Sequence, residues 1–318
     1  MAQLQDELIT VFHQGDEGRA RALVSRLGAE PRQARAVLEA MLENPEARVR
    51  QAAAFGLGEL GGSASARRLE QQLALEETRG DYDGESVAEV ITQALSRIKE
   101  TGARATLVRR LKRLVTGSPQ PSEVTLLARA LWRNRHPELL PAVQQSMEQL
   151  SLPAPSSLHG LRVLLEKPPE ALGAWAREPA IPVEYKTRVL TVLEEDVPEH
   201  WASTLTAFIA TARMLLPQAV SQEGEAADYC ERLFSLLLLH RERLLGALPA
   251  EARTELHAVA RALVAATSMG CAVRAAVMLK LVGREEDAAL LEAHRPGDAT
   301  FAKVFDDAAH ALRGPRRS

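Results

Sequence analysis

Aromatic residues are scarce in this sequence, which has three tryptophans, three tyrosines and six phenylalanines among 318 residues. Runs of β-branched residues, which favour strands, are also nearly missing. Alanine and leucine dominate an apolar fraction of 46%, and with arginine, glutamate and glutamine they are the strongest helix formers. The composition therefore argues against a β-sheet protein and predicts an all-α protein with a sizeable core.

Cysteines and long apolar runs are scarce as well. The two cysteines, Cys230 and Cys271, lie in no C-x-x-C pair or Cys/His cluster, so we expect buried thiols and neither a disulfide framework nor a zinc site. The longest dense apolar run, residues 233–239, is far shorter than the roughly 20 residues of a membrane-spanning helix. Since the opening residues already include Asp6 and Glu7, no signal peptide is predicted. We expect a cytoplasmic protein with no membrane insertion.

Catalytic and cofactor motifs give no convincing match. Gly56-x-Gly58-x-x-Gly61 fits the dinucleotide-binding pattern, but the pattern requires a preceding strand, whereas residues 49–55 are alanine-rich and have a helical period. Close helix packing explains Gly56 and Gly58 better, and a helix stop explains Gly61. No histidine is followed by glutamate, and no P-loop or G-x-S-x-G elbow occurs. We therefore predict no enzyme activity, no catalytic residue, no cofactor and no metal.

The sequence repeats a helical frame with small or apolar residues at steps of four, which places them on one helix face. Helices of similar length lie between these frames, at about 31–43, 64–76, 103–115 and 285–294, separated by Gly, Pro or Asn. One helix pair cannot cover its own apolar face, so neighbouring pairs are expected to stack. The frames are Val49, Ala53 and Leu57 with Gly61; Val87, Ile91 and Leu95; Val273, Val277 and Leu281 with Gly283; and Val304, Ala308 and Leu312 with Gly314.

The stretch from Asn44-Pro45 through Val49-Arg50 and Ala53 to Gly61-Gly62 resembles the HEAT repeat and its phycobilin-lyase-like subfamily. The resemblance covers about residues 31–100 and again 270–314. It implies an α-solenoid of stacked antiparallel helix pairs, a HEAT/armadillo-like superhelix whose concave face binds partners.

Three consecutive segments follow from the strength of this repeat pattern. Residues 1–150 are expected to form N-terminal HEAT-like repeats, 151–269 degenerate helical repeats continuous with them, and 270–318 C-terminal repeats with a tail, 314–318, that frays. The middle segment predicts long helices at 198–216, 225–245 and 249–269. The leucine-rich stretch 233–239 is apolar nearly all round, which indicates burial between neighbours or, alternatively, a face open to a partner.

Basic residues concentrate between Arg97 and Arg135, although the net charge of the chain is −3. One interpretation is an ordinary solvated helix face, with Leu107, Leu111 and Leu114 buried and the arginines projecting elsewhere. The other is a positive patch for an acidic protein surface or for phosphates, sharpened by an exposed tryptophan as anchor. A buried tryptophan is the commoner case. The candidate partner-binding residues are Arg109, Arg110, Arg113, Arg129, Trp132, Arg133 and Arg135.

The function expected from these features is a non-enzymatic interaction scaffold or adaptor that binds another protein on the concave surface. One alternative is a nucleic-acid-binding protein similar to the HEAT-like alkylpurine glycosylases, against which the pI of about 6.3 and the few aromatics argue. Another is a bilin lyase or chaperone subunit, suggested by the family resemblance alone. The partner and the oligomeric state do not follow from the sequence.

Overall fold

The computed structural model describes residues 2–28, 30–117, 119–150 and 156–314. Over these ranges the chain forms nineteen α-helices and one short 3-10 helix, with no strand, which confirms the predicted all-α class. It divides into two compact units, Met1–Leu152 (unit 1) and Pro153–Ser318 (unit 2). The predicted boundaries at residues 150 and 269 stay predictions. Residues 315–318, most of the tail predicted to fray, lie outside the described part.

Unit 1 consists of nine helices within its described residues, and five of them correspond to helices that the sequence analysis predicted. They are α1 (Ala2–His13), α2 (Glu17–Val24), α3 (Pro31–Met41), α4 (Ala47–Leu60), α5 (Gly62–Arg79), α6 (Tyr82–Arg97), α7 (Thr101–Val115), α8 (Pro121–Arg133) and α9 (Leu139–Gln149).

Helix ends in unit 1 follow from local sequence signals. Helices α3 and α8 both begin with proline in their first turn, where no backbone hydrogen bond is lost. Helix α5 ends before Gly80, whose φ of 64° lies in the left-handed region that other residues rarely adopt. The side chain of Asp81 then accepts a hydrogen bond from the backbone N–H of Gly84 and caps α6. Proline and glycine therefore fix where these helices start and stop.

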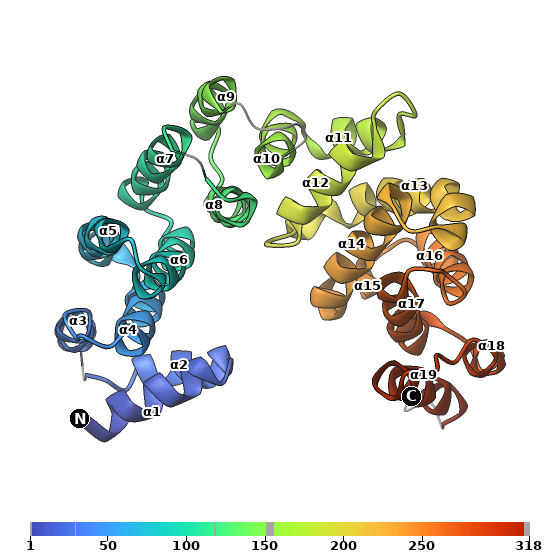
Figure 1. Cartoon of the computed structure of the whole chain (residues 1–318), viewed down its shortest axis with the longest axis horizontal. Coiled ribbons are helices and arrows are strands. Elements are labelled where there is room, and N and C mark those ends of the chain that lie inside the picture. Colours follow the sequence, from blue (N-terminus) through green and yellow to red (C-terminus); the bar gives the residue numbers. More distant parts are fainter. Residues whose placement is uncertain (1, 29, 118, 151–155, 315–318) are drawn as a thin grey trace. The chain divides into compact units, whose positions relative to one another are not determined.

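The helices of unit 1 pack in two rows (Figure 1). One row consists of α4, α6 and α8, each against the next, and the other of α5, α7 and α9. The rows are joined because α5 also packs on α4 and α6, and α7 on α6 and α8. Helix α4 additionally contacts α1, α2 and α3. Neighbouring pairs thus cover one another's apolar faces, and the frame residues Ala53, Leu57, Val87, Ile91 and Leu95 are completely buried.

Two glycines allow α4 to approach its neighbours closely. A Cβ atom at Gly56 would lie 2.7 Å from a methyl of Leu38 on α3, and one at Gly58 would lie 2.8 Å from Cα of Ala94 on α6. Both distances are too short for real contacts. The neighbour of Gly58 is a backbone atom, which cannot move aside as the Leu38 methyl can, so the spacing of α4 and α6 requires glycine at this position. The structure confirms that these glycines serve helix packing.

Unit 2 contains the remaining described helices, which also pack in two rows. Helices α10, α12, α14, α17 and α19 follow one another in the first row, and α11, α13 and α16 in the second, while α18 packs on α19 (Figure 1). The rows meet where α13 contacts α14 and where α16 contacts α17. The elements are α10 (Ser157–Glu166), α11 (Pro169–Arg177), α12 (Val183–Leu193), η1 (Glu199–Trp201), α13 (Ala202–Ser221), α14 (Glu225–Leu239), α15 (Arg241–Ala247), α16 (Ala250–Leu263), α17 (Met269–Val282), α18 (Asp287–Ala293) and α19 (Ala299–Arg313).

Several details of unit 2 differ from the sequence prediction. The predicted helix 249–269 ends at Leu263, and the predicted helix 198–216 begins as a 3-10 turn and runs on to Ser221. The predicted helix 225–245 is interrupted at His240, so that Leu239 ends α14 and is 63% exposed, whereas Leu233 and Leu237 are buried as expected. On α17 the predicted frame is not the buried face: Leu281 is 44% exposed, while Ala275, Ala276 and Leu279 lie in the core. The apolar surface all around α17 makes the buried face impossible to choose from periodicity alone.

Candidate partner-binding surfaces

The predicted basic residues on α7 form ion pairs with the neighbouring helix α5. Arg113 lies 2.7 Å from Glu77 through Nη2 and Oε2, and Arg109 pairs with Glu70. Both arginine side chains are 49% exposed. Their charges are therefore matched by carboxylates within unit 1, and each pair links two helices of the same row.

Arg110 does not project into solvent, contrary to the sequence interpretation. The residue is 5% exposed, and its Nη1 donates a 2.9 Å hydrogen bond to the backbone carbonyl of Ala88 on α6. Burial lowers the pKa of Arg110, an effect that the nearby negative charge of Glu77 opposes. The period of α7 puts Arg110 on the leucine face beside Leu107 and Leu111, so this arginine joins α7 to α6 instead of meeting a partner.

Trp132 on α8 is also buried, with only 2% of its surface exposed. The structure thus rules out the interpretation of Trp132 as an exposed anchor and places it in the core. The guanidinium of Arg135 lies 4.7 Å above the centre of its ring, in cation–π geometry. Arg129 and Arg133 are half-buried on the same helix, and Lys99 donates to the carbonyl of Arg133. The seven predicted residues are therefore divided between two structural settings, one at α5–α7 and one around Trp132.

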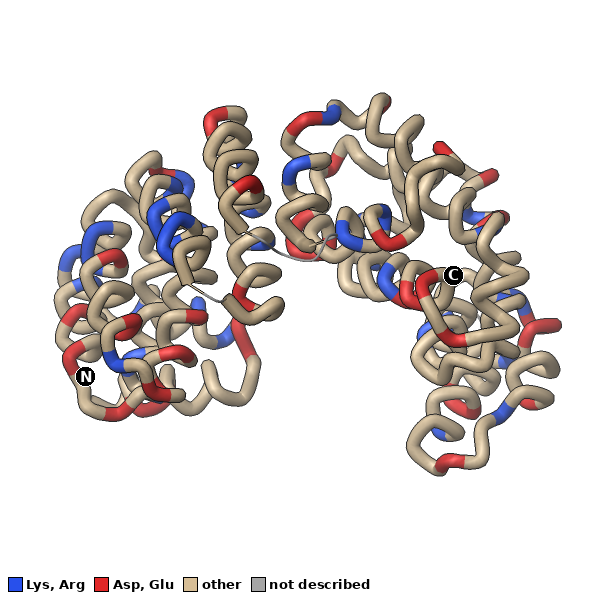
Figure 2. The backbone as a smooth tube through the Cα atoms, turned by 45° about the horizontal axis from the view of Figure 1, so that its top comes forward, with Lys and Arg blue, Asp and Glu red and all other residues tan. Residues whose placement is uncertain are grey.

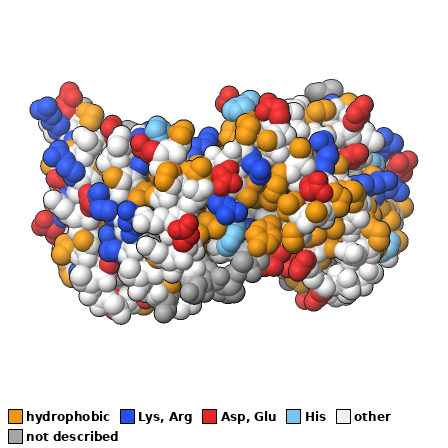
Figure 3. Space-filling model, turned by 90° about the horizontal axis from the view of Figure 1, so that it is seen from above, with side chains coloured by type: hydrophobic (Ala, Val, Ile, Leu, Met, Phe, Trp, Pro, Cys, Tyr) orange, Lys and Arg blue, Asp and Glu red, His pale blue; other side chains and the backbone are white. Residues whose placement is uncertain are grey.

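Charges of both signs are interspersed over the two units. Figure 2 shows Lys and Arg segments alternating with Asp and Glu segments along the backbone. On the face drawn in Figure 3, basic, acidic and hydrophobic side chains are intermingled. A nucleic-acid surface usually shows a basic stripe of one sign, and the pairing of the α7 arginines with acids does not favour one here.

A second network of charges, which the sequence analysis missed, joins three helices of unit 1. Glu59 on α4 accepts from Arg21 of α2 at 2.5 Å and from Arg97 of α6 at 2.9 Å. Arg97 also pairs with Glu17 and lies 5.0 Å from the ring centre of Phe55. These partners are 38 or more residues apart in sequence, so no local sequence pattern predicts the ion pairs.

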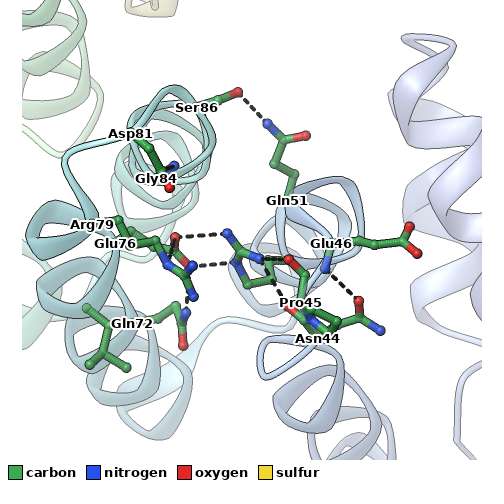
Figure 4. A network of polar contacts seen from close by, with 12 residues as sticks. Asn44, Pro45, Glu46, Gln51, Gln72, Glu76, Arg79, Asp81, Gly84 and Ser86 are labelled. Carbon is green, nitrogen blue, oxygen red and sulfur yellow. Dashed lines mark hydrogen bonds and ion pairs between the residues drawn. The ribbon is translucent and has the colours of Figure 1, made fainter.

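One ion pair is completely buried between α4 and α5 (Figure 4). Nε of Arg50 lies 2.7 Å from Oε1 of Glu76, and their side chains are 1% and 0% exposed. Arg50 also donates to the carbonyls of Asn44 and Pro45, in the turn before its own helix. Gln72 donates to Glu76 at 2.6 Å. This network gives Arg50 a structural role.

In unit 2 the carboxylate of Asp287, at the start of α18, interacts with hydrogen-bond donors from α16 and from the preceding turn. It accepts hydrogen bonds of 2.7 Å from His257 and from the backbone N–H of Arg284, and it pairs with Arg261. Burial alone would raise the pKa of Asp287, but these hydrogen bonds and the charges of His257 and Arg261 lower it overall. The cluster fastens α18 to α16.

The cysteines are buried, as predicted. Burial raises the pKa of both thiols, that of Cys271 to about 11, so neither is a thiolate at neutral pH.

Across the described residues, no group of three or more His, Cys, Asp or Glu side chains is placed to hold a metal ion. Over those same residues, no helix combines the length and apolarity needed to cross a membrane.

Grooves on the surface lie between neighbouring helices. One, of about 850 Å³, lies between α1 and α3 at the start of α4 and combines apolar with charged residues. A second, of about 440 Å³, lies between α12 and α14 and is lined mainly by charged residues and threonines. A third, of about 280 Å³, lies between α11 and α13. The apolar residues that line the first groove are Ile9, Val37, Met41 and Val49, with alanines of α3 beside them.

No family model matches the sequence. No curated protein matches it either. Among solved structures, the crystal structure of an engineered protein aligns with 97% of this chain and 88% of its own length, at 16% identity and a TM-score of 0.32. A TM-score this low supports no conclusion about fold or function.

Proposed function

We propose that this chain is an α-solenoid of the HEAT type and acts as a non-enzymatic scaffold that binds another protein. The single observation that carries the proposal is the sequence spacing of the contacts between helices. Hydrogen bonds and ion pairs join helices one helix pair apart along the chain, and they do so in both units.

Several of these contacts join residues 35 to 38 apart in sequence. In unit 1, Gln51 bonds to Ser86, 35 residues on, and Arg113 to Glu77, 36 residues back. In unit 2, Thr211 donates to the carbonyl of Ala176 at a separation of 35, and Arg232 to Glu194 at 38. Contact between each repeat and its sequence neighbours is the defining property of repeat proteins. Such stacking produces extended surfaces that suit protein partners.

The strongly perturbed ionisable groups support a structural role over a catalytic one. Catalytic groups with shifted pKa values usually lie in clefts that a substrate can enter. Here burial raises the pKa values of Tyr229 and Cys230, and both side chains are completely buried between α13, α14 and their neighbours. Tyr229 donates its hydroxyl to the carbonyl of Phe208, which is a packing contact.

Affinity purification from the native host, combined with chemical cross-linking and mass spectrometry, tests the proposal. We expect a specific protein partner whose cross-links map to the described helices. The reversed-charge variant Arg109→Glu/Arg113→Glu separates the predicted basic patch from other surfaces: loss of the partner would assign binding to α7. Recovery of chaperones alone would contradict the scaffold function, as would turnover of a small substrate by the purified chain.

A further inference from the structure

The groove between α1 and α3 is built by two helices that present the same periodic face to each other. Helix α1 contributes Gln5, Asp6, Ile9 and Thr10, and α3 contributes Ala36, Val37, Ala40 and Met41. Each set has the spacing i, i+1, i+4, i+5, which places its members on one side of a helix. Both helices pack on α4, whose residue Val49 lines the groove between them.

The groove is large enough to receive part of a helix. An α-helix with its side chains is about 10 Å wide and rises about 5.4 Å per turn, so each turn occupies about 420 Å³. The groove measures about 850 Å³, enough for about two turns. On its α3 side Ala36 and Ala40 are exposed, and such small side chains permit another helix to approach closely.

The charges at the rim set the chemistry of the occupant. Asp6 and Glu46 are exposed carboxylates that line the groove, and neither has an ion-pair partner among the residues that the structure describes. In Figure 4 the carboxylate of Glu46 points away from the buried network around Glu76. Arg48 is the one basic residue lining the groove, so the rim is acidic on balance.

We propose that this groove binds an amphipathic α-helix of a partner protein, whose apolar stripe covers Ile9, Val37 and Val49 and whose basic flank faces Asp6 and Glu46. Helix-in-groove recognition of this kind uses apolar anchors at i, i+3, i+4 and i+7. The inference rests on the proposed scaffold function, to which it adds a site and a partner class.

Two synthetic peptides test the inference, each a helix of about 18 residues with leucines at i, i+3, i+4 and i+7. One carries lysines beside the stripe and the other glutamates. Fluorescence anisotropy should show saturable binding of the lysine peptide and weaker binding of the glutamate peptide. The double variant Asp6→Lys/Glu46→Lys should reverse that order, because it reverses the charge of the rim.

Two variants in which an exposed alanine is replaced by arginine test whether the peptide binds in the groove. Ala40→Arg places a large side chain in the groove at an exposed position and should weaken binding of the lysine peptide by about tenfold or more. Ala174→Arg, the same change at an exposed position of α11, should leave binding unchanged. Circular dichroism of each variant establishes that its helices are intact. Failure of both peptides to bind, or equal binding by the Ala40→Arg variant, would overturn the inference.

The same variants separate this inference from the scaffold function. If the partner captured by the full chain stays bound to the Ala40→Arg variant, the groove assignment is wrong and the scaffold function stands. If the chain instead forms dimers that Ala40→Arg disrupts in sedimentation experiments, a second copy occupies the groove, and the inference of a partner helix is likewise overturned.

Discussion

Arg50 and Glu76 form a buried ion pair between α4 and α5, with Nε 2.7 Å from Oε1 and neither side chain more than 1% exposed. Glu76 reaches beyond this pair, since it also lies 3.0 Å from Nε of the half-exposed Arg79. Arg50 in turn satisfies the carbonyls of Asn44 and Pro45. The pair therefore holds together a helix, the turn before it and the next helix.

Removing one partner of this pair leaves a buried charge without compensation. We expect Glu76→Ala to lower the free energy of unfolding by about 3–5 kcal/mol, measured by urea denaturation. The control is Glu43→Ala, because Glu43 is 77% exposed and lies 3.6 Å from Arg68, so its removal should cost less than about 1 kcal/mol. Similar losses of unfolding free energy for the two variants would show that the buried pair stabilises the protein no more than an exposed pair does.

The arginines of α7 allow a second comparison within one helix. Arg110→Ala removes a buried donor from the carbonyl of Ala88 and should cost about 2–4 kcal/mol. Arg113→Ala breaks an exposed pair with Glu77 and should cost less than about 1 kcal/mol. Thermal and urea unfolding measure the loss of stability in each variant. Equally small losses for Arg110→Ala and Arg113→Ala would restore the interpretation of Arg110 as a solvated or partner-binding residue.

The sequence predicted α3 to α7 well because prolines, glycines and helical periodicity act locally. Periodicity also identified the buried frame from Ala53 to Leu95, since these helices have one clearly apolar face. It could not choose the buried face of α17, which is apolar all around. Nor could it assign partners to the arginines, because Glu70 lies 39 residues from Arg109 and Glu77 lies 36 from Arg113. Only packing of α7 on α5 brings them together.

The candidate groove was missed for a related reason. Its floor is supplied by α1, α3 and α4, and none of these segments carries a recognisable binding motif. The signal present in the sequence is the pair of small residues Ala36 and Ala40 beside Val37, outside the core positions Ala34 and Leu38. That pattern indicates a groove only when α1 is known to lie opposite α3.

Close packing at Gly58 makes a strong prediction about helix spacing. Gly58→Ala would place Cβ 2.8 Å from Cα of Ala94, so α4 and α6 would have to separate, at a cost of about 1–3 kcal/mol. Gly102→Ala is the matched control on α7: a Cβ there meets nothing within 4 Å, and the higher helix propensity of alanine should stabilise the protein by up to about 1 kcal/mol. Urea unfolding of both variants measures these changes in the free energy of unfolding. If Gly58→Ala stabilised the protein, α4 and α6 would not be in close contact at this position.

The Asp287 cluster predicts a specific dependence of stability on pH. Because the folded state lowers the pKa of Asp287 below its ordinary value of 3.8, the ionised carboxylate stabilises the fold fully above that value. The contribution is lost as the pH falls below 3.8 through the lowered pKa. Asp287→Asn abolishes this titration, so the difference in unfolding free energy between wild type and variant should shrink over that acidic range.

Urea unfolding at a series of pH values from about 2 to 6 measures this difference. Other carboxylates with lowered pKa values, Glu292 and Asp306, titrate in wild type and variant alike, so their contributions cancel in the comparison. Asp307→Asn, at an exposed position of α19, is a control for the loss of one carboxylate outside the cluster. A difference for Asp287→Asn that stays constant with pH would mean that the donors from His257, Arg261 and Arg284 do not hold the carboxylate ionised, and that α18 is fastened to α16 by packing alone.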